Sequence, residues 1–510
     1  MAGKVEQSTS PKTAKAMTTS TPTLGYASIL TNLIVKLEEE LQAPYHEEDP
    51  VCNCGNAPLA VLKTRPDDVI KLAHEKLHVF PFKDVPSGWR RLYTEAALWE
   101  ALKILKRVRP DIGNENDEKT RLCGGIGDQE DWVSDVVKTL DMAIILTGAP
   151  LREDLFASIM KELGKIVGEP FPEASASSGQ SDTNDVTLEG RPTKRQKLVK
   201  DSSSTIRDFP TIFPSSETPQ SALHYPIPRV LAPSLSAFST HMHSHGTPLI
   251  ITDALNHWPA LSDHPWFNPR YLLYQTVHGR RLVPIELGRS YTDEDWGQRI
   301  TTFGSFLVEH MLASTNTDGQ HPKGYLAQHD LLSQVPALRA DVSIPDYCYV
   351  DPPVPGVSIP SAPLLDEPML NAWFGPSGTI SPLHTDPYHN ILTQVVGHKY
   401  IRLYAPSQTS KLYPRGIGDD GVDMGNTSLV DISEAIALFK RGEPDAGVDG
   451  RTSACLEARQ LEFLESFPRF NEAEYVEGIL GPGECLYIPQ GWWHYVQSLD
   501  VSISVSFWWN

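Results

Sequence analysis

Two histidines and an aspartate near the carboxy-terminal end have the types and spacing of a metal site. His384 and Asp386 lie two positions apart in 381-SPLHTDPYHN-390, and His494 follows in 482-PGECLYIPQGWWHYVQSL-499. An extended strand places residues i and i+2 on one face, so we expect His384 and Asp386 to lie side by side. Two imidazoles and one carboxylate on one face of an octahedral ion leave three positions open, the arrangement that non-haem Fe(II) oxygenases use.

Chance is the alternative, because a chain with many histidines and acidic residues contains His-x-acid pairs that do no chemistry. The stretch 46-HEE-48 is one such pair. A second cluster, 241-HMHSHG-246, alternates three histidines, but its flanking residues indicate the end of a helix, where histidine interacts with the terminal carbonyls. Spacing alone therefore leaves both interpretations of His384, Asp386 and His494 open.

Lys399 is a candidate anchor for an acidic co-substrate. It begins the run 399-KYIRLY-404, after a turn at Gly397-His398 that we expect to pair this run with 391–396 as a hairpin. A lysine within a run of strand-forming residues either reaches solvent or neutralises a carboxylate inside the protein. Most such lysines point outward, so its role depends on the metal site.

The elements that must position these residues are short strands. Strand-length apolar runs after residue 208 occupy 249–251, 282–285, 372–374, 391–396, 400–404, 485–488 and 501–507. Glycine and proline turns separate them, a pattern typical of an antiparallel sandwich or barrel.

The amino-terminal part predicts helices instead. Leu30, Leu33, Ile34, Leu37 and Leu41 recur at intervals of three and four, as one face of an amphipathic helix requires. Similar periodicity returns in 67–79, 91–107, 129–147 and 151–167. A helical domain therefore precedes the strands.

Composition and charge limit the possible functions. The 510 residues carry a formal net charge of −20, which argues against nucleic-acid binding by the chain as a whole. A basic protein partner fits this charge, although charge alone is explained more simply by solubility. We expect neither a membrane span nor a secretory signal, because no apolar run is long enough and the amino-terminal stretch lacks an apolar core. Six scattered cysteines form no disulfide or zinc pattern, so we expect the nucleus or cytoplasm.

Two long stretches resemble the JmjC family of Fe(II)- and 2-oxoglutarate-dependent oxygenases. They are 371-NAWFGPSGTISPLHTDPYHNILTQVVGHKYIRLYAPSQ-408 and 483-GECLYIPQGWWHYVQSLDVSISVSFWWN-510. Shorter stretches agree in order: 247-TPLIITDALNHWPA-260, 283-VPIELGRSYTDEDWGQ-298, 324-GYLAQHDLL-332 and 343-SIPDYC-348. The resemblance implies an α+β chain with a carboxy-terminal double-stranded β-helix of the cupin or jelly-roll type, preceded by an all-α helical domain.

These observations together divide the chain into four segments. We expect a disordered tail over 1–22, a helical domain over 23–170, a disordered linker over 171–207 and a JmjC domain over 208–510. The catalytic core is expected at about 365–510. Within the linker, 191-RPTKRQKLVK-200 is typical of a nuclear-import signal, although a charged linker without function is equally compatible with it.

The resemblance also implies roles for individual residues. His384, Asp386 and His494 match the iron ligands, and Lys399 matches the residue that pairs with the distal carboxylate of 2-oxoglutarate. Tyr325, Ser381 and Asn390 match its hydrogen-bonding neighbours, while Glu286 and Trp373 match positions that line the pocket for the target side chain. An acidic group and a flat indole suit a guanidinium, which pairs with a carboxylate and stacks on a ring. Barrel core is the alternative for Trp373.

The implied activity is hydroxylation of arginine in a basic protein, or removal of methyl groups from histone lysine by the same chemistry. Other classes are a JmjC scaffold without activity, a metal-storing cupin and a protease. The complete ligand set disfavours the scaffold, Lys399 disfavours the storage protein, and no nucleophile arrangement supports the protease. The chain departs from the family in an extra segment, 433–465, which we expect to form a helix and a surface excursion, and in a long loop over 312–324.

Overall fold

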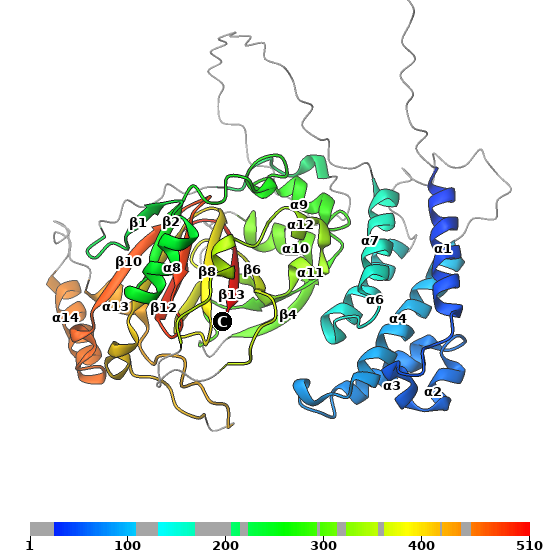
Figure 1. Ribbon diagram of the computed structural model, residues 1–510, viewed down its shortest axis with the longest axis horizontal. Coiled ribbons are helices and arrows are strands. Elements are labelled where there is room, and N and C mark those ends of the chain that lie inside the picture. The colour runs from blue at the N-terminus through cyan, green and yellow to red at the C-terminus, as the bar shows by residue number, and fades with distance from the viewer. Residues whose placement is uncertain are drawn as a thin grey trace, which may run out of the picture.

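A computed structural model describes residues 25–108, 131–168, 206–214, 223–292, 296–313, 323–354, 362–418, 421–439 and 450–510. The predicted tail over 1–22, almost all of the linker over 171–207, and most of the loop over 312–324 lie outside these residues. Figure 1 places the helices of the amino-terminal part beside a body of strands and shorter helices.

The amino-terminal part is helical, as predicted. Its helices are α1 (Tyr26–Gln42), α2 (Asn56–Val61), α3 (Pro66–Leu77), α4 (Ser87–Val108), α6 (Trp132–Thr147) and α7 (Glu153–Val167). The five apolar residues of α1 that recur at three and four are all buried. Each such leucine or isoleucine contributes about 1.5–3 kcal/mol on burial, which fixes the face that α1 turns to its neighbours.

The carboxy-terminal part contains two sheets, which form the expected double-stranded β-helix. The larger has the order β1-β2-β11-β8-β13-β6-β5-β3-β4, and the smaller has the order β10-β9-β12-β7. The strands are β1 (Arg229–Leu231), β2 (Leu249–Thr252), β3 (Leu282–Leu287), β4 (Gly297–Thr302), β5 (Gly324–His329), β6 (Met369–Gly375), β7 (Ile380–His384), β8 (His389–Val396), β9 (Lys399–Tyr404), β10 (Tyr475–Leu480), β11 (Cys485–Ile488), β12 (Trp493–Ser498) and β13 (Ser502–Trp509). Among the described residues, the paired strands of both sheets are antiparallel except β1 with β2.

Alternation along each strand separates the inside of the barrel from its outer faces. In β9, Ile401 and Leu403 belong to the apolar cluster between the sheets, whereas Tyr400 and Tyr404 belong to a different cluster with α13 (Ile432–Leu438). Lys399 has the parity of Ile401 and Leu403, so its side chain enters the barrel.

The predicted hairpin of 391–396 with 400–404 is wrong. β8 lies in the larger sheet, whereas β9 lies in the smaller sheet between β10 and β12. Gly397, at φ 69°, turns the chain from one sheet to the other, and the backbone N–H of His398 donates to the Asp500 carboxylate at 2.6 Å. A local turn signal does not reveal whether the next strand pairs or crosses, because this contact comes from the far end of the chain.

Helices cover the outer faces of both sheets. The larger sheet packs against α8 (Leu235–Ser244), α9 (Pro269–Gln275), α10 (Phe303–Phe306), α11 (Leu331–Gln334) and α12 (Pro336–Ala340). The extra segment 433–465 supplies most of α13 and of α14 (Gly450–Ser466), and Leu438 and Phe463 bury themselves against the smaller sheet. This segment is therefore partly core.

Three further predictions can be compared with the structure. The histidines of 241–246 do end a helix, with His245 as the C-cap of α8. The five cysteines within the described residues are unpaired. Across the same residues, no helix is both long and apolar enough to cross a membrane.

Candidate active site

The structure brings His384, Asp386 and His494 together. His384 ends β7 and lies directly opposite His494 of β12 in the antiparallel pair. The Nε2 atom of His494 lies 3.4 Å from Asp386 Oδ2, the Nε2 atom of His384 lies 3.9 Å from Asp386 Oδ1, and the two ring centroids are 4.1 Å apart. One ligand atom from each residue lies within 4.8 Å of the other two, and this is the single such group of His, Cys, Asp or Glu among the described residues.

The prediction that His384 and Asp386 share a strand face is wrong in detail, because β7 ends at His384. Asp386 lies in the following loop, where its carbonyl accepts from the Gly491 N–H at 3.1 Å and the preceding Thr385 N–H donates to Asn426 at 2.8 Å. These backbone bonds position the carboxylate from both sides. The three side chains converge although the strand ends before the third.

Hydrogen bonds orient both imidazoles. The Nδ1 atom of His384 lies 2.7 Å from the Pro382 carbonyl, and that of His494 lies 3.0 Å from the Trp492 carbonyl. A carbonyl only accepts, so each Nδ1 carries the proton and each Nε2 presents a lone pair toward Asp386. This is the orientation in which histidine ligates a metal.

Burial and charge set the protonation of these groups. Burial, helped by the neighbouring His494, lowers the pKa of His384 to about 4. Burial alone would raise the pKa of Asp386, but the close approach of His494 Nε2 and the positive charge that the two imidazoles carry when protonated hold it below its usual value. A neutral imidazole and an ionised carboxylate at pH 7 are the forms that bind divalent iron, so the donor set fits this ion.

A second polar group lies deeper in the barrel. Lys399 is 2% exposed, and its Nζ atom lies 3.4 Å from the Tyr325 hydroxyl; no ion pair is found for it among the described residues. Burial lowers the pKa of Lys399 to about 7. Asn390 Oδ1 is buried without a hydrogen-bond partner, and Ser381 is hydrogen bonded to Tyr325. A buried ammonium and an unpartnered amide are costly unless a ligand pairs with them, and a dicarboxylate such as 2-oxoglutarate fits this need.

Glu286 and Trp373 lie next to Tyr325, and we refer to these three side chains together with Lys399 as the wall of the site. Glu286 of β3 lies opposite Tyr325 of β5 in the antiparallel register, and burial raises the pKa of its carboxyl. Trp373 donates from Nε1 to Ser506 Oγ at 3.0 Å, and its ring centroid lies 6.0 Å from that of Tyr325. Trp373 also packs against the apolar cluster between the sheets, so it is at once part of the barrel core and part of the wall.

Two aromatic residues beside the wall were missed. Tyr291 lies near both Asp386 and Glu286, whose charges help to raise its pKa after burial itself, and its hydroxyl lies 3.5 Å from Thr427 Oγ1. The indole N–H of Trp296 is buried without a well-aligned partner, yet it lies close enough to Glu286 to oppose the rise in that pKa. Both follow Glu286 in 283-VPIELGRSYTDEDWGQ-298, so proximity in sequence was the available signal.

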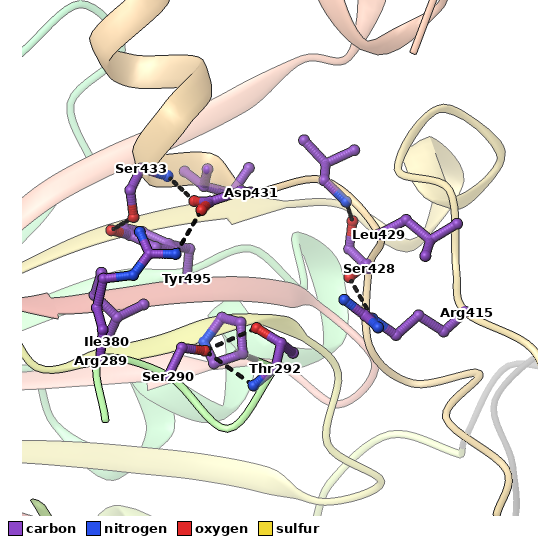
Figure 2. Close-up of a pocket in the computed structure, with 13 residues that line it drawn as sticks. Arg289, Ser290, Thr292, Ile380, Arg415, Ser428, Leu429, Asp431, Ser433 and Tyr495 are labelled. Carbon is purple, nitrogen blue, oxygen red and sulfur yellow. Dashed lines mark hydrogen bonds and ion pairs between the residues drawn. The ribbon is translucent and has the colours of Figure 1, made fainter. Parts of the chain in front are cut away.

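Figure 2 shows the residues that line a separate cavity. Its lining includes Arg289, Arg415, Asp431 and Tyr495, and none of the nine predicted site residues. Pro382 also lines it, while the Pro382 carbonyl pairs with His384, so β7 separates the cavity from the metal-ligand atoms. An ion pair of 2.8 Å between Arg289 and Asp431 closes one side.

Comparisons with known proteins agree with this arrangement. A family model described as a cupin-like domain matches residues 235–510. The chain is 33% identical over 456 residues to Lysine-specific demethylase 8 of Danio rerio, covering 89% of each chain. It is 33% identical over 449 residues to Lysine-specific demethylase JMJ30 of Arabidopsis thaliana, covering 86% of this chain and 84% of the relative. It is 39% identical over 284 residues to Jumonji C domain-containing protein 5 of Drosophila melanogaster, covering 56% and 60%.

A double-stranded β-helix with a His-Asp-His group at one end defines the class of JmjC-type oxygenases. The chain belongs to the cupin-like JmjC family and is a 2-oxoglutarate-dependent oxygenase. Its family generally uses Fe(II) together with 2-oxoglutarate.

Proposed function

We propose that this enzyme hydroxylates arginine side chains of basic proteins, with Fe(II) as the metal and 2-oxoglutarate and dioxygen as co-substrates. The observation that carries the proposal is the convergence of two oriented imidazoles and one carboxylate beside a wall that contains a half-buried acid, Glu286. Iron and 2-oxoglutarate together supply the oxidising power that inserts one oxygen atom of dioxygen into a C–H bond.

His384, Asp386 and His494 hold the iron in this proposal. Their Nδ1–H bonds to backbone carbonyls keep both rings fixed, so little ordering remains to be done when the metal binds. The remaining positions around the ion stay available to the co-substrates.

Lys399, Tyr325, Ser381 and Asn390 hold 2-oxoglutarate. The Lys399 ammonium pairs with the distal carboxylate, the Tyr325 and Ser381 hydroxyls donate to it, and Asn390 supplies an amide whose oxygen has no protein partner. Because Lys399 is almost fully buried, water cannot compete for this carboxylate.

Glu286 and Trp373 hold the target side chain, with Tyr291 and Trp296 beside them. A guanidinium pairs with a carboxylate through two parallel N–H···O bonds and stacks on an indole, so an acid between aromatic rings selects it. The net charge of −20 favours the approach of a basic protein. Location in the nucleus or cytoplasm is part of the proposal, and the basic run 191–200, outside the described residues, would suit nuclear import.

A second candidate is demethylation of N-methyl-lysine in histones. It is supported by the names of the relatives from Danio rerio and Arabidopsis thaliana. The same oxidation at an N-methyl carbon gives a hydroxymethyl amine, which releases formaldehyde and leaves the amine with one methyl group fewer. Both candidates consume one 2-oxoglutarate and one dioxygen and release succinate and carbon dioxide.

The experiment that tests the proposal incubates the full chain with Fe(II), 2-oxoglutarate and two sets of basic peptides, one with arginine and one with N-methyl-lysine, followed by mass spectrometry. We expect a gain of one oxygen atom on arginine and an equal amount of succinate. Loss of methyl groups with formaldehyde would support the second candidate. Unchanged peptides without succinate would contradict both and favour a scaffold.

Two variants control this experiment. Asp386→Ala should abolish succinate release, because it removes the one carboxylate of the metal group. Asp263→Ala, at an exposed position away from the site, should leave it unchanged. Activity that persists in Asp386→Ala would assign the oxidation to a contaminant or to another metal site.

A further inference from the structure

Asp141 is a buried carboxylate of the helical domain whose partners lie in the catalytic part of the chain. It is fully buried and lies in α6, a helix that Figure 1 shows on the side of the helical domain toward the barrel. It pairs with Arg281, which is 2% exposed. A buried carboxylate is retained only when hydrogen bonds and charge compensate it, so these partners are fixed contacts.

The first partners lie at the start of β3. Arg281 donates from Nε to both carboxylate oxygens, at 2.9 and 3.0 Å, and its Nη2 lies 2.7 Å from Oδ1. The backbone N–H of Leu282, the first residue of β3, donates to Oδ2 at 2.7 Å. Asp141 thereby accepts the backbone N–H of β3 that a neighbouring strand would otherwise accept.

The second partner leads to the end of β5. Gln334 Nε2 donates to Asp141 at 2.9 Å and to the Leu282 carbonyl at 2.8 Å, while Gln334 Oε1 lies 2.6 Å from Nε2 of His329. An amide oxygen accepts, so His329 donates here. His329 is the last residue of β5, so one chain of contacts joins the start of β3 to the end of β5.

The contacts of Asp141 and Gln334 connect β3 and β5 where these strands form no backbone hydrogen bonds with each other. The register of β3 with β5 contains two pairs, Glu286 with Tyr325 and Leu287 with Gly324. Toward the other end the strands separate, and Leu282 and His329 are connected through Gln334 instead of through ladder bonds. Two strands that pair at one end and separate at the other are held at a fixed distance only if something secures the separated ends.

We propose that Asp141 is a positioning residue of the active site: it secures the separated ends of β3 and β5 and so sets the placement of Glu286 and Tyr325 for substrate. The helical domain is then part of the substrate site through one carboxylate, although it touches neither substrate nor metal. This inference rests on the proposed function, since it takes Glu286 as the acid that binds the basic side chain.

A purely structural role is the competing explanation, because removing one partner of any buried ion pair destabilises a protein. The chain offers a matched control. Asp49, also buried and also in the amino-terminal part, accepts the Val51 N–H at 2.9 Å and pairs with buried Arg91 at 3.1 Å, but it has no link to β3 or β5. Asp49→Asn therefore reports the cost of a lost buried carboxylate without the connection.

The test compares Asp141→Asn and Asp49→Asn in the full chain. The first measurement is hydrogen exchange of the backbone amides in 282–287 and 324–329, with no substrate present. We expect at least about 10-fold faster exchange in both segments for Asp141→Asn, and rates like the wild type for Asp49→Asn. The second measurement is the KM for an arginine peptide, which should rise about 10-fold in Asp141→Asn while kcat, measured with saturating 2-oxoglutarate, stays within about 2-fold.

Each result decides the proposal. Equal exchange in wild type and Asp141→Asn, or a KM that rises no more than in Asp49→Asn, would overturn it. If the wild type oxidises no peptide, the proposed function fails, and exchange alone still decides whether Asp141 secures both strands. If Asp141→Asn does not fold, Gln334→Met keeps the ion pair and removes the link to His329, and it must show the same changes in 324–329.

Discussion

Replacement of Lys399 by methionine should stabilise the protein without its co-substrate and abolish binding of 2-oxoglutarate. Burial lowers the pKa of Lys399 from 10.5 to about 7. At about 1.4 kcal/mol per pKa unit, keeping this lysine in the barrel costs about 4–5 kcal/mol at pH 7. Loss of its contact with Tyr325 costs about 1 kcal/mol, so Lys399→Met should raise the free energy of unfolding by about 3 kcal/mol.

The rise in the free energy of unfolding caused by Lys399→Met should depend on pH. The pKa in the folded protein lies below that in the unfolded chain, so the unfolded chain binds the additional proton between about pH 7 and 10.5. The free energy of unfolding of the wild type therefore rises with pH across this window. Below pH 7 the full cost of burying Lys399 is present. The difference between Lys399→Met and wild type should fall from about 3 kcal/mol at pH 7 to near zero at pH 10.

Urea unfolding without oxygen, with Mn(II) in place of iron, measures both effects. At 100 times its dissociation constant, 2-oxoglutarate should stabilise the wild type by about 2.7 kcal/mol and Lys399→Met not at all. Lys36→Met, at an exposed lysine of α1, is the control and should behave as wild type within about 0.5 kcal/mol. A less stable Lys399→Met that still responds to 2-oxoglutarate would refute the reasoning.

Three other predictions concern the metal, the target pocket and the added helices. Asp386→Asn should lower metal affinity at least about 100-fold by calorimetry, because it removes the charge of the ligand group, and an unchanged affinity would exclude Asp386 as a ligand. Glu286→Gln should raise the KM for an arginine peptide about 10- to 100-fold with 2-oxoglutarate binding unchanged, since a charge-assisted pair contributes about 1.5–3 kcal/mol; equal KM values would place the guanidinium elsewhere. Phe463→Ala should lower the free energy of unfolding by about 3–5 kcal/mol, because this side chain is buried against the smaller sheet. Leu461→Ala, at an exposed position of the same helix, should have little effect. Equal small losses in both variants would show that α14 is dispensable.

The sequence predicted the elements with a strong period and missed those without one. α7 begins and ends within two residues of the predicted range, and α1 contains the five predicted apolar positions, because their apolar residues recur at three and four. α2 has six residues and no buried one, so no period marks it. β4 reads GQRITT, and none of its six residues is buried, so it carries no apolar alternation.

Spacing alone left His384, Asp386 and His494 open as a metal group, and the resemblance of the surrounding stretches to the JmjC family selected them; their geometry was not predictable from either. Asp386 reaches the histidines from a loop, which depends on backbone bonds to Asn426 and Gly491 that arrive from other parts of the chain. Tyr291 and Trp296 follow Glu286 closely in sequence, but only the folded chain shows that Tyr291 lies near Asp386 and that the Trp296 indole lies near the Glu286 carboxyl. Short-range patterns reveal residue types, whereas contacts over long sequence distances decide what those residues face.

The most direct test of the central claim is an anomalous difference map from crystals grown without oxygen in the presence of Fe(II) and 2-oxoglutarate. A single strong iron peak should lie about 2.0–2.2 Å from Nε2 of His384, Nε2 of His494 and one carboxylate oxygen of Asp386. An iron peak bound elsewhere, or a well-loaded crystal with no peak between these three side chains, would contradict the account.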